Sequence, residues 1–233
     1  MPQVVVVGRA LSHGIRYNAD NHCVKDWIYN QNVLEKIEKY RDDIKVLVAI
    51  QESNYIKRQF SKWKKIDFST MDEKYLQTAK HSLSRDACCA LFKDFGFDPS
   101  NISRRKLKYI TGGWFEEYIY QWCLNNNDGK IDPDNIALNV SIERGNDRNE
   151  LDVVFLDRQN RFYVFECKSF VDGFGGEKVL NDALYKLQAI IKSKFGLNIK
   201  SGICTMSDVD KESALNRAGD FNIEVFDRNR LRV

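Results

Sequence analysis

The chain has 233 residues, of which 43% are hydrophobic and 30% are charged, and its formal net charge at pH 7 is +3. This length suffices for one or two domains with their own core, and the apolar run at residues 4–7 is too short for a signal peptide or a membrane span. The three histidines form no HExxH motif, and the six cysteines contain no CxxC pair, which argues against zinc or a redox dithiol. We therefore expect a cytoplasmic protein without membrane contact.

Residues 1–108 predict a smaller N-terminal region that is α/β or mostly helical. Residues 3–8 are typical of a buried first strand, residues 24–40 of a helix and residues 44–50 of a second strand. The remainder of the region is expected to be mostly helical. The region is either a reduced α/β unit or the remnant of a longer domain.

The basic excess of the chain lies in its first half. Residues 1–111 contain 20 Lys and Arg against 13 Asp and Glu, whereas the remainder contains 16 against 20. The basic residues gather in two clusters. The first consists of Lys57, Arg58, Lys62, Lys64 and Lys65, and Phe60 and Trp63 interleave with it. The second consists of Arg104, Arg105, Lys106 and Lys108. Basic groups beside aromatic rings suit a nucleic-acid backbone with unstacked bases. The alternative is a solvated helix face with two core aromatic residues.

The second half begins with a predicted helix over residues 114–124. Its apolar residues recur at helical spacing: Phe115, Tyr118, Ile119, Trp122 and Cys123. Glu116 lies at the edge of this apolar stripe and Glu117 nearly opposite it, so Glu116 is the better candidate to reach an interior site. Glu116 could equally be a first-turn acid that interacts with the helix dipole. Residues 136–142 predict a strand.

Residues 150–156 and 161–168 predict an antiparallel hairpin, since both are rich in Val, Phe, Tyr and Leu. A loop of about three residues, 158–160, with Asn160 in the left-handed conformation would pair 157 with 161. That register places Asp152 opposite Glu166.

Three ionisable groups converge if this register holds. Opposed residues share a sheet face about 5 Å apart, and Lys168 shares the face of Glu166 because strand side chains alternate. Two opposed acids in an apolar hairpin are destabilising unless a cation lies between them. A slip of one residue would send the acids to opposite faces. The alternative is a set of solvated charges on a half-exposed hairpin.

The remaining elements complete an α/β unit. Residues 177–194 predict a helix, residues 199–205 a strand, residues 209–218 a short helix and residues 222–226 a last strand. From the helix at 114–124 onward the order is therefore α-β-β-β-α-β with a helix and a strand appended.

Three motifs in this order carry a family resemblance: GGWFEEY at 112–118, ELDVVF at 150–155 and ECK at 166–168. Together they resemble the metal site of the PD-(D/E)XK nuclease superfamily, in particular the nuclease half of CRISPR-ancillary effectors that join a CARF sensor domain to such a core. The resemblance covers residues 109–233 and implies a restriction-endonuclease-like α/β core there. Residues 1–108 would then be a reduced sensor, or a nucleic-acid-binding or dimerisation domain.

The resemblance implies a metal-dependent endonuclease that acts on DNA, RNA or both in antiviral or CRISPR-linked defence. Asp152 and Glu166 would bind Mg²⁺ or Mn²⁺, with the Cys167 carbonyl as a further ligand. Lys168 would orient or deprotonate the attacking water, and Glu116 would support these ligands or bind a second ion. A homodimer and a cyclic oligoadenylate activator are also implied. The alternative function is a regulatory module that binds nucleic acid or a cyclic nucleotide on a nuclease-like fold without turnover.

Overall fold

The computed structural model describes residues 16–19, 31–78, 82–144, 147–172, 176–194 and 199–231. The chain divides into two compact units, one made of residues 1–25 with 115–233 and the other of residues 26–114. The strand expected at residues 3–8 lies outside the described residues, as does the first part of the helix expected at 24–40. Among the described residues, no helix combines the length and apolarity needed to cross a bilayer.

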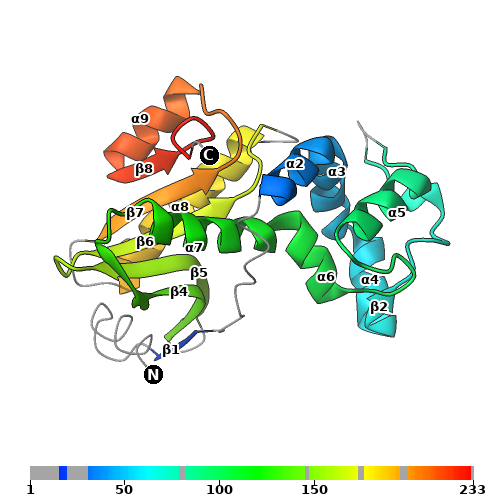
Figure 1. Ribbon diagram of the computed structural model, residues 1–233, viewed down its shortest axis with the longest axis horizontal. Coiled ribbons are helices and arrows are strands. Elements are labelled where there is room, and N and C mark those ends of the chain that lie inside the picture. Colours follow the sequence, from blue (N-terminus) through cyan, green and yellow to red (C-terminus); the bar gives the residue numbers. More distant parts are fainter. Residues whose placement is uncertain are drawn as a thin grey trace. The chain divides into compact units, whose positions relative to one another are not determined.

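The first unit is built on a six-stranded sheet in the order β1-β4-β5-β6-β7-β8 (Figure 1). Strands β1, β4, β5 and β6 are antiparallel, whereas β6, β7 and β8 run parallel. The strands are β1 (Arg16–Ala19), β4 (Ile131–Arg144), β5 (Asp147–Asp157), β6 (Phe162–Lys168), β7 (Lys200–Thr205) and β8 (Ile223–Phe226). The expected α/β core is confirmed, with the unexpected addition of β1 from the first part of the chain.

Among the described residues, three helices accompany this sheet: α7 (Trp114–Asn125), α8 (Gly176–Lys194) and α9 (Glu212–Asp220). The apolar side of α8 is buried in one core with residues of the strands, and this core includes Val154, Val164, Leu180, Leu184, Leu187 and Ile190. Because strand side chains alternate, Glu166 points to the same side as Val164, where Lys186 of α8 contacts it and where Asp152 interacts with it. The face of the sheet that α8 covers is therefore also the face that carries the acids.

The hairpin of β5 and β6 has the register that its sequence predicts. Val153 pairs with Phe165, and the amide of Asp157 donates to the carbonyl of Arg161 at 3.0 Å. Asn160 has a φ of 58°, the left-handed conformation expected at the end of the loop. The ladder ends at Val153 and Phe165, so Asp152 and Glu166 are the next residues on the two strands.

The second unit is mostly helical, which confirms one of the two expectations for the N-terminal region (Figure 1). Its two short strands, β2 and β3, pair antiparallel. The elements are α2 (Gln31–Lys39), α3 (Arg41–Gln51), α4 (Asn54–Trp63), β2 (Lys65–Ile66), the short helix η1 (Glu73–Tyr75), α5 (Arg85–Asp94), β3 (Ile102–Ser103), α6 (Arg104–Lys108) and the π-helical turn η2 (Tyr109–Gly113).

The strand expected at residues 44–50 is wrong, because these residues lie within helix α3. A short apolar run fits a buried strand or a buried helix equally well, and burial decides between them. Ile44, Leu47 and Ile50 are buried at a spacing of three, whereas Val48, which would share a strand face with Ile44, is exposed. Asp42 and Asp43 in the first turn also suit the positive end of a helix dipole.

Candidate active site

Two neighbouring strands supply the centre of the site. Glu166 on β6 is 1% exposed and Asp152 on β5 is 8% exposed. The backbone amide of Cys167 donates to Oδ2 of Asp152 at 2.7 Å, which ties the two strands together at this point. Such deeply buried carboxylates are uncommon in proteins unless a cation or hydrogen-bond donors compensate them.

Two lysines converge on the carboxylate of Glu166. Nζ of Lys168 lies 2.7 Å from Oε1. Nζ of Lys186, on α8, lies 2.8 Å from Oε1 and 2.9 Å from Oε2. Sequence reasoning missed Lys186, because the position of α8 on the sheet decides which of its several lysines reaches the acids. Its one sequence signal is its place beside the buried positions of α8, next to Leu187.

Glu116 reaches this group from the first turn of α7. Burial raises the pKa of Glu116 to about 6, the charges of Glu150 and Glu166 add to the rise, and that of Lys168 opposes it. The side chain of Asn139 on β4 also makes a hydrogen bond to Glu116. The fold therefore brings Glu116 into electrostatic contact with the acids of the hairpin, the position expected of it rather than of Glu117.

Burial, followed by the crowding of like charges, dominates the electrostatics of the carboxyl groups in the site. Burial raises the pKa of Asp152 well above its ordinary value, and Glu166 and Glu116 raise it further. Burial alone would lower the pKa of Lys168, but Glu166 and Asp152 outweigh it, so the pKa is raised. Lys168 is therefore an ammonium cation at neutral pH in this arrangement.

The chemistry of these side chains fits a hard divalent cation. The interacting carboxyl groups of Glu116, Glu150, Asp152 and Glu166 carry four negative charges when ionised, against two positive charges on Lys168 and Lys186, which leaves −2. Oxygen donors are the ligands that Mg²⁺ and Mn²⁺ prefer. Within the described part of the chain, no three acidic, histidine or cysteine side chains already stand close enough together to hold an ion. Binding would therefore require a rearrangement around Glu166.

The predicted nucleic-acid-binding residues lie apart in sequence but meet in the second unit. Lys65 on β2 pairs with Ser103 on β3, which directly precedes Arg104 and Arg105 of α6. The lysine cluster at the end of α4 is thereby joined to the basic start of α6. Lys57 and Arg58 lie on α4 itself, and Lys57 forms a 2.7 Å ion pair with Glu52.

Trp63 is 61% exposed, so it is not a core residue. The ammonium of Lys62 lies 4.6 Å from the centre of its ring. A large aromatic ring exposed among lysines favours the binding interpretation of this surface over that of a helix face with two core aromatic residues.

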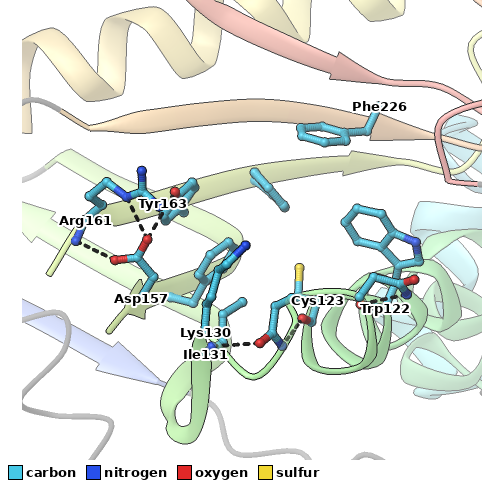
Figure 2. A pocket seen from close by; sticks show the side chains of 12 residues that line it. Trp122, Cys123, Lys130, Ile131, Asp157, Arg161, Tyr163 and Phe226 are labelled. Carbon is cyan, nitrogen blue, oxygen red and sulfur yellow. Dashed lines mark hydrogen bonds and ion pairs between the residues drawn. The ribbon is translucent and has the colours of Figure 1, made fainter. Parts of the chain in front are cut away.

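A pocket of about 230 Å³ lies on the other face of the sheet (Figure 2). Phe155, Tyr163 and Phe165 line it, and these residues alternate along the strands with Asp152 and Glu166. Trp122 and Phe226 close it from α7 and β8, and at its rim Nε of Arg161 donates to Asp157 at 2.7 Å. The pocket is thus separate from the acidic site.

Two family models match the chain. The model of the Card1-like endonuclease domain matches residues 103–232, more than half of the chain. The chain belongs to the Card1-like endonuclease family. A model of the Card1 hinge domain matches residues 20–104. These matches confirm the predicted resemblance to PD-(D/E)XK nucleases of CRISPR-linked effectors.

Solved structures show the same fold. Protein VC1899 from Vibrio cholerae is 19% identical with a TM-score of 0.62, and the match covers 94% of this chain and 56% of that one. Can2 from Sulfobacillus thermosulfidooxidans, solved in complex with cyclic tetra-adenylate, is 24% identical with a TM-score of 0.59, covering 92% and 56%. The Card1-like chain thus spans just over half the length of each. A search of curated proteins found no match.

Proposed function

We propose that this Card1-like protein is a metal-dependent nuclease that hydrolyses phosphodiester bonds of DNA, RNA or both in CRISPR-linked defence. The observation that carries the proposal is the convergence of Asp152, Glu166 and Lys168 on one buried sheet face, with Glu116 beside them. Membership of an endonuclease family supports the reaction class. The buried carboxylates support the proposal of a divalent metal ion, since such ions prefer oxygen ligands.

Asp152, Glu166 and the carbonyl oxygen of Cys167 would hold Mg²⁺ or Mn²⁺. Such an ion would activate a water molecule and offset negative charge on the phosphate under attack. Lys168 donates hydrogen bonds as an ammonium, so it orients the attacking water or a phosphate oxygen and stabilises the developing negative charge. Glu116, with its raised pKa, can supply a further carboxylate once a cation is near.

The proposal is tested by incubating the protein with single- and double-stranded DNA and RNA in Mn²⁺, Mg²⁺ or EDTA. We expect cleavage in Mn²⁺ or Mg²⁺ and none in EDTA. The proposal would be supported if the wild type cleaves in a metal-dependent manner and the Lys168→Ala variant does not. Nucleic-acid binding without cleavage under any condition would instead favour the non-catalytic module.

A cyclic oligoadenylate is proposed as an activator, because Can2 was solved with cyclic tetra-adenylate and shares this fold. The same assay therefore includes cyclic tetra-adenylate as an added component.

Cutting two strands calls for two sites, so we also propose a homodimer. Light scattering during gel filtration would test it, and a monomeric mass together with double-strand cutting would contradict it.

We further propose that the joined basic surface of α4, β2 and α6 holds the nucleic acid. Its lysines would contact phosphates, and Trp63 would stack on a base. Replacing Trp63 with alanine is expected to weaken binding to single strands about tenfold, since stacking on one base is worth about 1–3 kcal/mol. Fluorescence polarisation in EDTA measures this without cleavage.

A Lys64→Glu, Lys65→Glu double variant should weaken binding to all sequences alike and reduce its dependence on salt. Lys93→Glu, an exposed change on α5, serves as the control for charge alone. Equal affinities for the wild type, the double variant and the Trp63→Ala variant would exclude this surface.

A further inference from the structure

Lys186 is a basic side chain at the acidic site that the PD-(D/E)XK motif does not include. Its ammonium contacts both oxygens of Glu166, at 2.8 and 2.9 Å, whereas Lys168 contacts only Oε1. Lys186 thus occupies both acceptor oxygens of a carboxylate that is 1% exposed. A cation that bound Glu166 through these oxygens would meet Lys186 first.

The position of Lys186 allows its ammonium group to release Glu166. Its side chain is 40% exposed, so its ammonium can return to water, whereas Glu166 cannot move into solvent. The backbone of α8 at this point is anchored by the buried neighbours Ala183 and Leu187. Release of the ion pair therefore needs only rotations of the long lysine side chain, with no shift of the helix.

We infer that Lys186 takes the place of the divalent cation at Glu166 in the metal-free protein and competes with the metal for this carboxylate. The inference rests on the proposed metal site. It accounts for two observations together: both carboxylate oxygens of the buried Glu166 contact ammonium groups, and no cluster of three ligands stands close together among the described residues. Lys186 is a positioning residue, since it acts through Glu166.

The competition has two opposite consequences for a variant without the Lys186 charge. Glu166 keeps Lys168 but loses the partner that contacts both of its oxygens. The protein without metal therefore becomes less stable, because the buried charge is less fully compensated. The metal no longer displaces an ammonium, so it binds more tightly. A residue with a merely structural role would lower stability and weaken metal binding together.

The experiment is calorimetric titration of Mn²⁺ into the wild type, Lys186→Met and Lys192→Met, followed by melting curves with and without Mn²⁺. Lys192 is an exposed lysine of the same helix and provides the matched control. We expect Lys186→Met to bind Mn²⁺ at least about tenfold more tightly than the wild type. Its melting temperature without metal should fall by about 2–4 °C, and its stabilisation by Mn²⁺ should be larger.

A second variant keeps the inference testable if Lys186→Met does not fold. Lys186→Gln keeps length and a hydrogen-bond donor but removes the charge, and it should also bind Mn²⁺ more tightly. Unchanged or weaker Mn²⁺ binding in the folded variants, with normal binding in the wild type, would overturn the competition but leave the proposed nuclease intact. Absence of Mn²⁺ binding by the wild type would overturn the metal site and this inference with it.

Discussion

Cleavage by the Lys168→Ala variant is expected to fall by about 100- to 1000-fold, the typical effect of removing a group that stabilises charge in a transition state. Lys168 is an ammonium whose pKa is raised by Glu166 and Asp152, and its Nζ lies at the acidic site. The fold should persist because Glu166 keeps Lys186 as a partner. Initial rates on a labelled strand in Mn²⁺, beside circular dichroism, provide the measurement.

Lys200→Ala is the control for this result, since Lys200 is an exposed lysine at the start of β7. Its cleavage rate should match that of the wild type. If Lys168→Ala and Asp152→Ala both cleave at the wild-type rate, the site lies elsewhere. If Lys168→Ala loses its circular dichroism signal, Lys168→Met, which keeps most of the aliphatic stem, replaces it.

The Asp152→Asn variant should lose cleavage and yet melt at a higher temperature than the wild type when no metal is present. Burial and two neighbouring acids raise the pKa of Asp152, so its ionised form destabilises the fold at neutral pH. Asparagine removes the charge and can still accept the hydrogen bond of the Cys167 amide through its oxygen. We expect a gain of about 1 kcal/mol, or roughly 2–4 °C.

The raised pKa of Asp152 makes the stability gained by Asp152→Asn depend on pH. An acid whose folded-state pKa is raised binds more protons in the folded than in the unfolded protein, so stability falls as pH rises above the ordinary value near 3.8. The gain from Asp152→Asn should therefore be larger at pH 8 than at pH 5. Mn²⁺ should stabilise the wild type more than the variant. A variant that melts below the wild type at pH 8 in EDTA would contradict the prediction, and Asp210→Asn, an exposed change, is the control.

The hairpin of the site could be predicted from the sequence because its information is local. A turn composition at residues 158–160, with Asn160 suited to a positive φ, determines the register, and strand alternation then brings Asp152, Glu166 and Lys168 to one face. The helix spacing of 114–124 in the same way selected Glu116 over Glu117. These steps need only neighbours along the chain.

The secondary-structure prediction was wrong where a short apolar run is compatible with both a strand and a helix. Residues 44–50 are rich in Val and Ile and therefore favour a strand by propensity, but they form part of α3. Packing of Ile44, Leu47 and Ile50 against the rest of the helical unit overrides that propensity. β1 was also not predicted, since Arg16–Ala19 carries little apolar signal and becomes a strand by pairing with β4.

The sequence by itself determined the α/β order of the core, the register of the hairpin and the two basic clusters, because each depends on local periodicity, turn chemistry or composition; the endonuclease type of the core came from the family resemblance of three motifs. Tertiary structure alone decided that Lys186 pairs with Glu166 and that Lys65 lies beside the start of α6. Each of these contacts joins segments that are at least 20 residues apart in the chain. The docking of whole helices and strands sets such contacts, and no local pattern of side chains encodes that docking.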